Sequence, residues 1–158
     1  MPPRPVTNAR LSKIWEEYIQ PLFRRPSRLQ VAALCLRGAD TAREVLMITS
    51  RDTGRWIIPK GWPMNGKTCA EAALQEAWEE AGVQEARIKD TPIGSYSYSK
   101  RRDNGTEEPV TTLIYAATVD KLAKAYPEAH QRTRQWMSPK AAAELVQEPE
   151  LQALLRSL

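Results

Sequence analysis

The chain has 158 residues, of which 42% are hydrophobic and 27% charged, and it carries a formal net charge of +4. These values are typical of one soluble globular domain, and no apolar run approaches the roughly 20 residues of a membrane-spanning helix. The positive charge suits a polyanionic partner, such as a phosphorylated small molecule or a nucleic acid, or it serves only to keep the surface soluble.

The first 26 residues form a predicted N-terminal extension, and residues 27–158 form the predicted main domain. Apolar residues within 9–22 recur at helical spacing, and Pro21 should end or bend that helix. The extension is basic but lacks the apolar stretch of a secretory signal, and the two cysteines, Cys35 and Cys69, lie in apolar surroundings where we expect reduced thiols. These features predict a cytoplasmic protein.

Strands and helices alternate along the main domain. Short apolar runs predict strands at 29–38, 44–52, 56–59, 86–100 and 109–119, and Asn104-Gly105 predicts the turn of a hairpin before the last of them. Helices are predicted over residues 69–81, from Pro139 to about Val146, and in a short segment that begins at Pro149. This order of elements predicts a mixed α/β domain.

The helix predicted at 69–81 has clear signals at both ends. Thr68 followed by Glu71 forms a capping box at its start, and Gly82 is the expected left-handed C-cap. Its apolar residues recur at intervals of three and four and should form one stripe that faces the core, consisting of Ala70, Ala73, Leu74, Ala77, Trp78 and Ala81.

Three glutamates on this helix lie in an unfavourable place. At 100° per residue, Glu76, Glu79 and Glu80 fall within an arc of roughly 100° beside the apolar stripe. Glu76 and Glu80 form a like-charge i,i+4 pair that costs roughly 0.2–0.5 kcal/mol, and Glu79 and Glu80 oppose the helix dipole at about 0.3–1 kcal/mol each. A divalent cation would turn this repulsion into attraction, and oxygen ligands suit Mg²⁺ or Mn²⁺. The alternative is a solvated surface face.

The stretch GWPMNGKTCAEAALQEAWEEAGV, residues 61–83, resembles the Nudix box. That pattern reads Gly, five residues, Glu, seven residues, Arg-Glu-apolar-x-Glu-Glu-x-Gly-apolar. The positions that match it are Gly61, Glu76, Ala77, Glu79, Glu80, Gly82 and Val83. Two positions depart from it, because Lys67 stands where the first Glu is expected and Gln75 stands where the Arg is expected.

The resemblance implies an α/β/α sandwich with a mixed sheet, in which the box forms a loop–helix–loop. It also implies hydrolysis of a nucleoside diphosphate linked to another group, with Mg²⁺ or Mn²⁺ as cofactor. Glu79 and Glu80 would be metal ligands, Glu76 would be a third ligand or the base that orients water, and the main-chain carbonyl of Gly61 would join the site. The general base stays open, with Glu107 and Glu108 as outside candidates.

The two departures leave room for a protein that binds without turnover. In the family the Arg of the box helps to orient the catalytic carboxylates by ion pairing, and Gln75 supplies a hydrogen bond but no charge. Lys67 removes one carboxylate of the pattern. A degenerate, non-catalytic sensor or interaction domain is therefore an alternative to an enzyme.

The segments WIIPKGW and RTRQWMSPKAA resemble the branch of the family that hydrolyses diphosphoinositol polyphosphates and diadenosine polyphosphates. A polyphosphorylated small molecule is therefore the predicted partner, with an RNA 5′-end as the alternative substrate, no membrane, and a monomer or homodimer as the assembly. Basic side chains would bind the phosphates. The predicted substrate-binding residues are Arg51, Arg55, Lys60, Lys67, Arg101 and Tyr98, with Lys100, Arg102, Arg132 and Arg134 as further basic residues. Tyr96 and Tyr98 either stack on an adenine or pack in the sheet.

Overall fold

The computed structural model describes residues 27–158, so the predicted N-terminal extension and its helix lie outside the described residues. At the centre of the fold, β1 (Arg28–Arg37) runs parallel to β7 (Glu107–Leu122), from Arg28 opposite Val110 to Leu36 opposite Thr118. All the other strand pairs of the described region are antiparallel, which makes the eight-stranded sheet a mixed one.

The remaining strands extend the sheet on both sides of this central pair. On one side β2 (Glu44–Thr49) pairs with β1, and both β3 (Trp56–Ile57) and β8 (Arg134–Met137) pair with β2. On the other side β5 (Val83–Ile88) and β6 (Gly94–Arg101) both pair with β7. The two-residue β4 (Lys60–Gly61) pairs with β1 and so brings the start of the glutamate segment onto the sheet.

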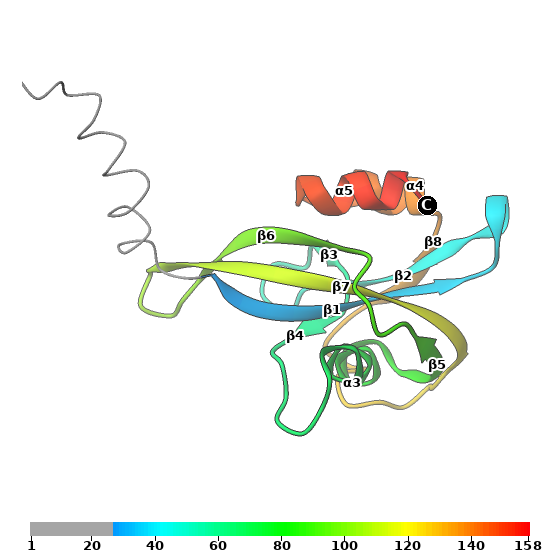
Figure 1. The fold of residues 1–158 in the computed structure, drawn as a ribbon, viewed down its shortest axis with the longest axis horizontal. Helices are drawn as coiled ribbons and strands as arrows, with labels where there is room; N and C mark the ends of the chain where they lie inside the picture. The colour runs from blue at the N-terminus through cyan, green and yellow to red at the C-terminus, as the bar shows by residue number, and fades with distance from the viewer. Residues whose placement is uncertain (1–26) are drawn as a thin grey trace, which may run out of the picture.

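Helices cover both faces of the sheet. The helix α3 (Cys69–Ala81) lies on one face, and α4 (Pro139–Leu145) and α5 (Pro149–Arg156) lie on the opposite face (Figure 1). A short 3-10 turn at Asp40–Ala42 joins β1 to β2. The predicted α/β/α sandwich is therefore confirmed. Within the described region no helix is long and apolar enough to cross a membrane.

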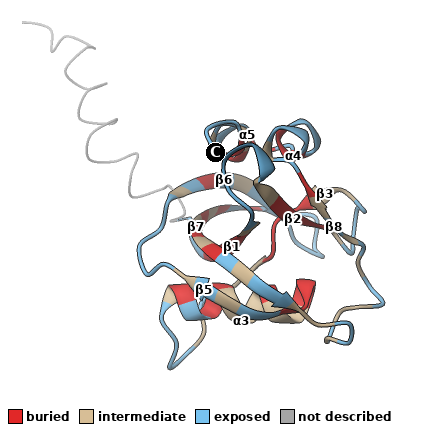
Figure 2. Ribbon diagram, turned by 90° about the vertical axis from the view of Figure 1, so that its right-hand side faces the viewer, coloured by how far each residue is buried: buried red, intermediate tan, exposed pale blue. Residues whose placement is uncertain are grey.

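The alternation of side chains along β1 divides the core into two parts. Val31, Ala33 and Cys35 pack with α3, whereas Ala32 and Leu34 pack with the α4–α5 layer. Because both faces of this strand are covered, its buried positions form a continuous apolar run, VAALC, as is usual for central parallel strands. Figure 2 shows buried residues along the centre of the sheet and on the sides of the helices that face it.

The sequence-based expectations for the strands and the hairpin are largely confirmed. The Asn104-Gly105 turn joins β6 to β7, with Gly105 at φ +80° and the Arg102 amide donating to the Thr106 carbonyl at 2.8 Å. Three details differ: β4 and β8 were not predicted, and the segment predicted as one strand at 86–100 belongs to two strands, β5 and β6.

The stripe predicted on α3 is also partly wrong. Ala70, Ala73, Ala77 and Ala81 are buried as expected, but Leu74 and Trp78 are only partly buried. Two residues outside the predicted stripe, Ala72 and Glu80, are buried instead. The buried face of α3 is therefore rotated toward the glutamates, because β4 packs on that side of the helix.

Candidate active site

The helix α3 is held firmly at both ends. At its start the Glu71 amide donates to Thr68 Oγ1 at 3.1 Å and the Thr68 amide donates to Glu71 Oε2 at 2.7 Å, which is the predicted capping box. At its end Gly82 adopts the predicted left-handed conformation with φ +69°. The glutamates therefore project from a rigid element.

The segment that precedes β8 closes the C-terminal end of α3. The amide of Glu128 donates to the Glu79 carbonyl at 3.0 Å, and the amide of Ala123 donates to the Gly82 carbonyl at 2.8 Å. Arg134 donates to the Ala81 and Ala123 carbonyls, each at 2.8 Å. These bonds satisfy carbonyls that a helix end leaves without partners, and the Arg134 cation complements the negative end of the dipole.

Gly61 makes room for the carboxylate of Glu76. A Cβ atom on Gly61 would overlap the carboxyl group of Glu76, so the glycine of β4 lets this carboxylate take its observed position. Lys60 and Gly61 pair with Ala32 and Val31 of β1, which fixes this approach on the sheet. The two box positions, fifteen residues apart in sequence, are thus brought into contact.

Glu80 is the most deeply buried of the three helix glutamates, with 7% of its surface exposed. Its Oε2 accepts a hydrogen bond from the Lys60 amide at 3.3 Å, and its Oε1 lies 3.3 Å from a guanidinium nitrogen of Arg132. Burial raises the pKa of Glu80, and Arg132 and then Lys60 act to lower it.

Glu76 is partly buried beside Glu80 and lacks such a cation of its own. Its pKa is raised to about 7, first by burial and then by the charges of Glu80, Glu79 and Glu128. A divalent cation next to these oxygens would remove the repulsion that causes the shift, so the carboxylates fit a Mg²⁺ or Mn²⁺ site.

Glu79 lies differently from its two neighbours. Its Oε1 accepts a hydrogen bond from Gln75 Nε2 at 3.0 Å, and Glu79 is not among the residues that line the cavity containing Glu76 and Glu80. Among residues 27–158 no group of three or more Asp, Glu, His or Cys side chains is gathered as a preformed metal site. Mg²⁺ is commonly held by only one or two carboxylates together with substrate phosphates, and Glu76 and Glu80 can supply these.

A cavity of about 570 Å³ opens over Glu76, Glu80 and Gly61. Seven of the basic and aromatic residues around it were predicted or noted from the sequence, and they come from the β2–β3 loop, β4, β6 and the connection before β8. They are Arg51, Arg55, Lys60, Tyr98, Lys100, Arg101 and Arg132. The structure thus places a row of cations next to a pair of carboxylates.

The predicted substrate-binding residues differ in how freely they can meet a ligand. Lys60 is largely buried, its ammonium lies 5.6 Å from the centre of the Tyr98 ring, and burial lowers its pKa while Glu80 opposes that change. Arg55 pairs with Glu148 at 2.8 Å, and Arg51 pairs with Glu128 at 3.1 Å. These pairs fix the direction in which the two guanidinium groups face.

Lys67 is not brought to this cavity. It lines a separate hollow on the outer side of α3, together with Gln75 and Trp78. Its predicted role in binding substrate is therefore not supported by its position, because the loop after β4 carries it away from Glu76 and Glu80.

The two tyrosines of β6 also separate. Tyr96 is 2% exposed and packs in the core beneath α4 and α5, so it cannot stack on a ligand base. Tyr98 is partly buried, lines the cavity, and donates its hydroxyl to Gln30. The stacking proposed for the pair is wrong for Tyr96 and stays a prediction for Tyr98.

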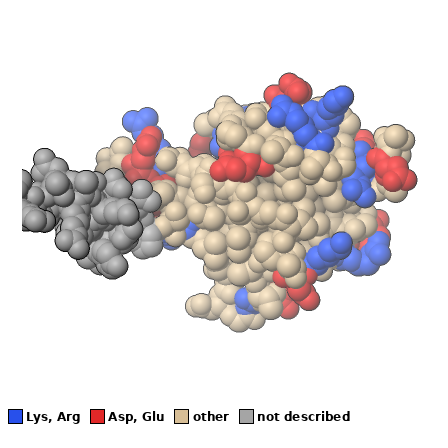
Figure 3. Space-filling model, turned by 45° about the horizontal axis from the view of Figure 1, so that its top comes forward, with Lys and Arg blue, Asp and Glu red and all other residues tan. Residues whose placement is uncertain are grey.

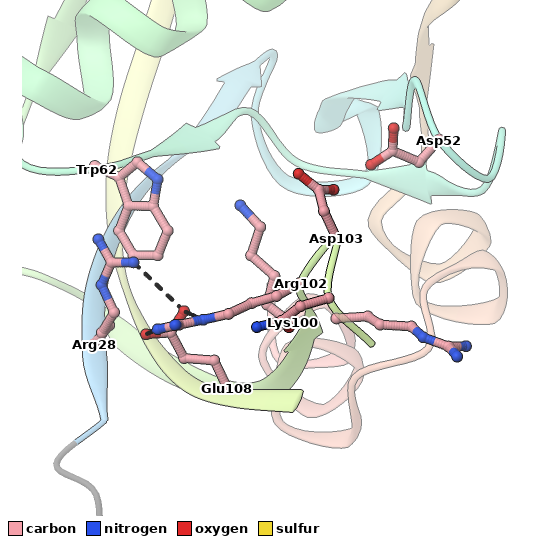
Figure 4. Close-up of a pocket in the computed structure, with 9 residues that line it drawn as sticks. Arg28, Asp52, Trp62, Lys100, Arg102, Asp103 and Glu108 are labelled. Atoms are coloured by element: carbon pink, nitrogen blue, oxygen red, sulfur yellow. Dashed lines mark hydrogen bonds and ion pairs between the residues drawn. The ribbon is translucent and has the colours of Figure 1, made fainter. Parts of the chain in front are cut away.

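A second cavity, of about 600 Å³, adjoins the first and shares Asp52, Trp62, Lys100 and Arg101 with it. Figure 4 shows Trp62 and Arg28 on one side of this cavity and Asp52 across from them. The Arg28 guanidinium lies 4.1 Å and the Lys100 ammonium 5.0 Å from the indole centre of Trp62. A ligand can therefore extend from the carboxylates past Trp62.

Glu107 and Glu108 are poorly placed to act as the general base. Glu108 accepts hydrogen bonds from Arg102 at 2.6 and 3.1 Å and from Arg28 at 3.4 Å, and the bond from Arg102 is the main cause that lowers its pKa (Figure 4). Glu107 is exposed at the start of β7. Neither residue lines the cavity that contains Glu76.

Sequence reasoning missed two acidic residues near the site, namely Asp52, which lines the cavity, and Glu128. Glu128 and Glu80 both lie against the same nitrogen of Arg132, at 3.4 and 3.3 Å. Glu128 is far from the box in sequence, and its place follows from the hydrogen bond between its amide and the Glu79 carbonyl. No local pattern in the segment PEAHQR predicts the contact of Glu128 with α3. The only available signal was that Glu128 lies four residues before Arg132, a spacing at which the two can pair.

The chain is similar in sequence to proteins of one known family. The family model described as "NUDIX domain" matches residues 26–158. Nudix hydrolase 16, mitochondrial, of Arabidopsis thaliana is 33% identical over 109 residues, which are 67% of this chain and 59% of that protein. Human diphosphoinositol polyphosphate phosphohydrolase 3-beta is 27% identical over 122 residues, 75% of this chain and 68% of that protein. The chain spans about half to three fifths of the length of the plant relatives it matches.

The fold also matches solved structures. The crystal structure of a C. elegans Ap4A hydrolase superposes with a TM-score of 0.62, covering 83% of this chain and 95% of that one at 18% sequence identity. At this identity the likeness establishes the fold alone.

Proposed function

The chain belongs to the Nudix family, and we therefore propose that it is a metal-dependent pyrophosphohydrolase that cleaves a phosphoanhydride bond in a polyphosphorylated small molecule. The observation that carries this proposal is the cavity that joins Glu76 and Glu80 to the basic residues of the sheet. Carboxylates that hold a cation and arginines that hold phosphate oxygens are the two parts that such a reaction needs.

Mg²⁺ or Mn²⁺ bound here would neutralise phosphate oxygens and lower the pKa of a water molecule. Glu76 and Glu80 would hold the cation, with the main-chain carbonyl of Gly61 as a further oxygen. The pKa of Glu76, about 7, also suits acceptance of a proton near neutral pH, so this residue can serve as ligand or base.

The basic residues would bind those phosphates of the substrate that do not contact the metal ion. Lys60 lies beside the carboxylates, since its main-chain amide contacts Glu80. Arg55 is directed by Glu148, and Arg101 lines both cavities. Because these residues are spread along two adjoining cavities, they suit a substrate with several phosphates rather than one.

Among such substrates we propose a diphosphoinositol polyphosphate ahead of a diadenosine polyphosphate. The human relative named for diphosphoinositol polyphosphates and the many cations of the cleft support this choice. The burial of Tyr96 removes one of the two rings that an adenine could stack on.

The two alternatives find less support. On the face of the described residues that Figure 3 presents, basic and acidic side chains form small mixed groups around a mainly uncharged centre, whereas a broad basic surface would suit long RNA. A non-catalytic sensor was suggested by Lys67 and Gln75, but Gln75 still holds Glu79, and Lys67 lies outside the cleft. The expected cytoplasmic location and the expected monomer or homodimer stay predictions.

The test is hydrolysis by the full chain with Mg²⁺ of a panel that contains a diphosphoinositol polyphosphate, diadenosine tetraphosphate, ADP-ribose, a nucleoside triphosphate and 5′-triphosphate RNA. Glu80→Gln should reduce turnover at least about 100-fold. Glu71→Gln is the matched control, because it makes the same change on the same helix outside the cavity, and glutamine also serves in a capping box.

The panel also separates the alternatives. Turnover of the RNA alone would replace the small-molecule proposal with the RNA-end reaction. Binding of a panel member without any turnover would contradict the enzyme and favour the sensor.

A further inference from the structure

Arg132 is an almost completely buried cation at the candidate metal site. Its side chain is 6% exposed and lies in the connection just before β8. One terminal nitrogen lies 3.3 Å from Glu80 Oε1 and 3.4 Å from Glu128 Oε1, and the other donates to the Thr49 carbonyl at 3.0 Å. The guanidinium therefore bridges α3, the segment after β7 and the end of β2.

The carboxylates around Arg132 need such a bridge. Glu80 and Glu128 contact the same nitrogen of Arg132, so their carboxylates lie close together, and Glu76 lies one turn before Glu80 on the same helix. Gln75, the neighbour one turn earlier on α3, offers a neutral amide and reaches only Glu79. Among the basic residues paired with these glutamates, Arg51 is 55% exposed, so solvent screens it far more than Arg132.

The geometry of the contact requires arginine rather than any cation. A guanidinium is planar and presents its donors in a fixed fork, whereas an ammonium is a single point charge on a flexible chain. With one arm fixed to the Thr49 carbonyl, the other arm has one position relative to the sheet. The two carboxylates that contact this arm are therefore held at one position as well.

We propose that Arg132 is a positioning residue of the metal site: with Glu128 as its second partner, it holds Glu80 in place for a divalent cation, while Gln75 holds Glu79. This assigns to the connection before β8 the task that the Nudix box pattern gives to an arginine at position 75. The proposal rests on the proposed function in one respect, namely that the carboxylates bind a metal ion.

The test is calorimetric titration of the folded full chain with Mn²⁺ alone, without substrate. Arg132→Lys keeps the charge but loses the fork, and we expect Mn²⁺ to bind at least about tenfold more weakly, as for other residues that orient metal ligands. Adding Gln75→Arg to this variant places a guanidinium next to Glu79, one turn from Glu80, and should restore part of the affinity.

A second variant separates positioning from simple charge. Arg132→Gln removes a positive charge from the site, so a residue that merely repelled the cation would give tighter Mn²⁺ binding when replaced. Positioning predicts weaker binding for this variant too, together with a lower kcat and a smaller change in KM. Tighter or unchanged binding in either Arg132 variant would overturn the proposal.

Arg134→Lys is the control for stability. Arg134 is also an arginine of this segment, but it contacts backbone carbonyls and not the glutamate side chains. Its replacement should lower Tm while Mn²⁺ affinity stays within about threefold of wild type, below the roughly 10-fold to 100-fold loss that removal of an orienting partner gives. If the wild-type chain bound no Mn²⁺, the metal-dependent function would fail as well; if it did and both Arg132 variants matched it, only this inference would fail.

Discussion

The carboxyl group of Glu76 packs against Gly61 at the mouth of the cleft, and its pKa rises to about 7 through burial and then through Glu80 and Glu79. In the unfolded chain the pKa is near 4.5. Without a metal ion, the ionised carboxylate of Glu76 therefore lowers the free energy of unfolding. This loss of stability is absent below pH 4.5, grows between pH 4.5 and about pH 7, and is complete above about pH 7.

Replacing Glu76 with glutamine should make the metal-free protein more stable at pH 8. We expect the free energy of unfolding to increase by about 1 kcal/mol, a value reduced from the full shift because the residue is only partly buried, and to change little at pH 4.5. Urea unfolding in the presence of a chelator at both pH values would measure this. The same gain at both pH values would show that the charge is not the cause, and Glu71→Gln serves as the control on the same helix.

At the scale of single residues, the site was predictable where the signal was local. Gly61, Glu76 and Glu80 follow from the spacing of one short segment, and the structure brings them together. Glu128 did not follow from any spacing, because its contact with the site depends on how a distant loop wraps the end of α3. Lys67 was misplaced for the opposite reason, since proximity in sequence does not fix the direction of a loop.

At the scale of elements, the C-terminal end of α3 depends on Arg134. Arg134→Ala would remove two hydrogen bonds to partly buried carbonyls and a cation at the negative end of the helix dipole. We expect a loss of about 2 kcal/mol in the free energy of unfolding.

The matched control for that loss is Arg87→Ala. Arg87 pairs with Asp120 on the surface with 75% of its side chain exposed, so its removal should change stability by less than about 0.5 kcal/mol. Chemical denaturation of both variants would compare them. Equal small effects would mean that other groups, such as the amides of Glu128 and Ala123, suffice to satisfy the helix end.

The elements themselves were predictable to different degrees. Helix α3 carries its start and stop signals in its own sequence, and both were found in the structure. Strand β8 has four residues, and its strand character comes from pairing with β2, which lies almost ninety residues earlier. The burial of Ala72 in place of a fully buried Trp78 likewise reflects where β4 packs, which helical periodicity does not contain.

At the scale of the whole molecule, Glu148 ties the C-terminal layer to the cleft. It precedes α5, its side chain is 7% exposed, and it pairs with Arg55 of the β2–β3 loop at 2.8 Å. Glu148→Ala should lower the free energy of unfolding by about 2 kcal/mol, because it leaves a partly buried guanidinium without its counter-ion.

Glu144→Ala is the comparison for that prediction. Glu144 pairs with Arg156 within the α4–α5 layer and is 71% exposed, so we expect a change below about 0.5 kcal/mol. Thermal unfolding of both variants would test the difference. A Glu148 variant as stable as the Glu144 variant would mean that the attraction between Glu148 and Arg55 only balances the cost of desolvating the two charges.

The parallel pairing of β1 with β7 also bears on how the chain reaches its native state. The first strand of the described region joins a strand that begins about eighty residues later, and the covering helices α4 and α5 are synthesised later still. On the ribosome β1 can pair early with β2 and β4, but the edge that pairs with β7 must wait until most of the protein has emerged. Pairing over such a separation is slow in folding, and chains in this state are prone to aggregate. The arrangement that buries the centre of the sheet so well thus leaves β1 without its main partner strand for most of synthesis, so we expect nascent chains of this protein to aggregate more readily than finished ones.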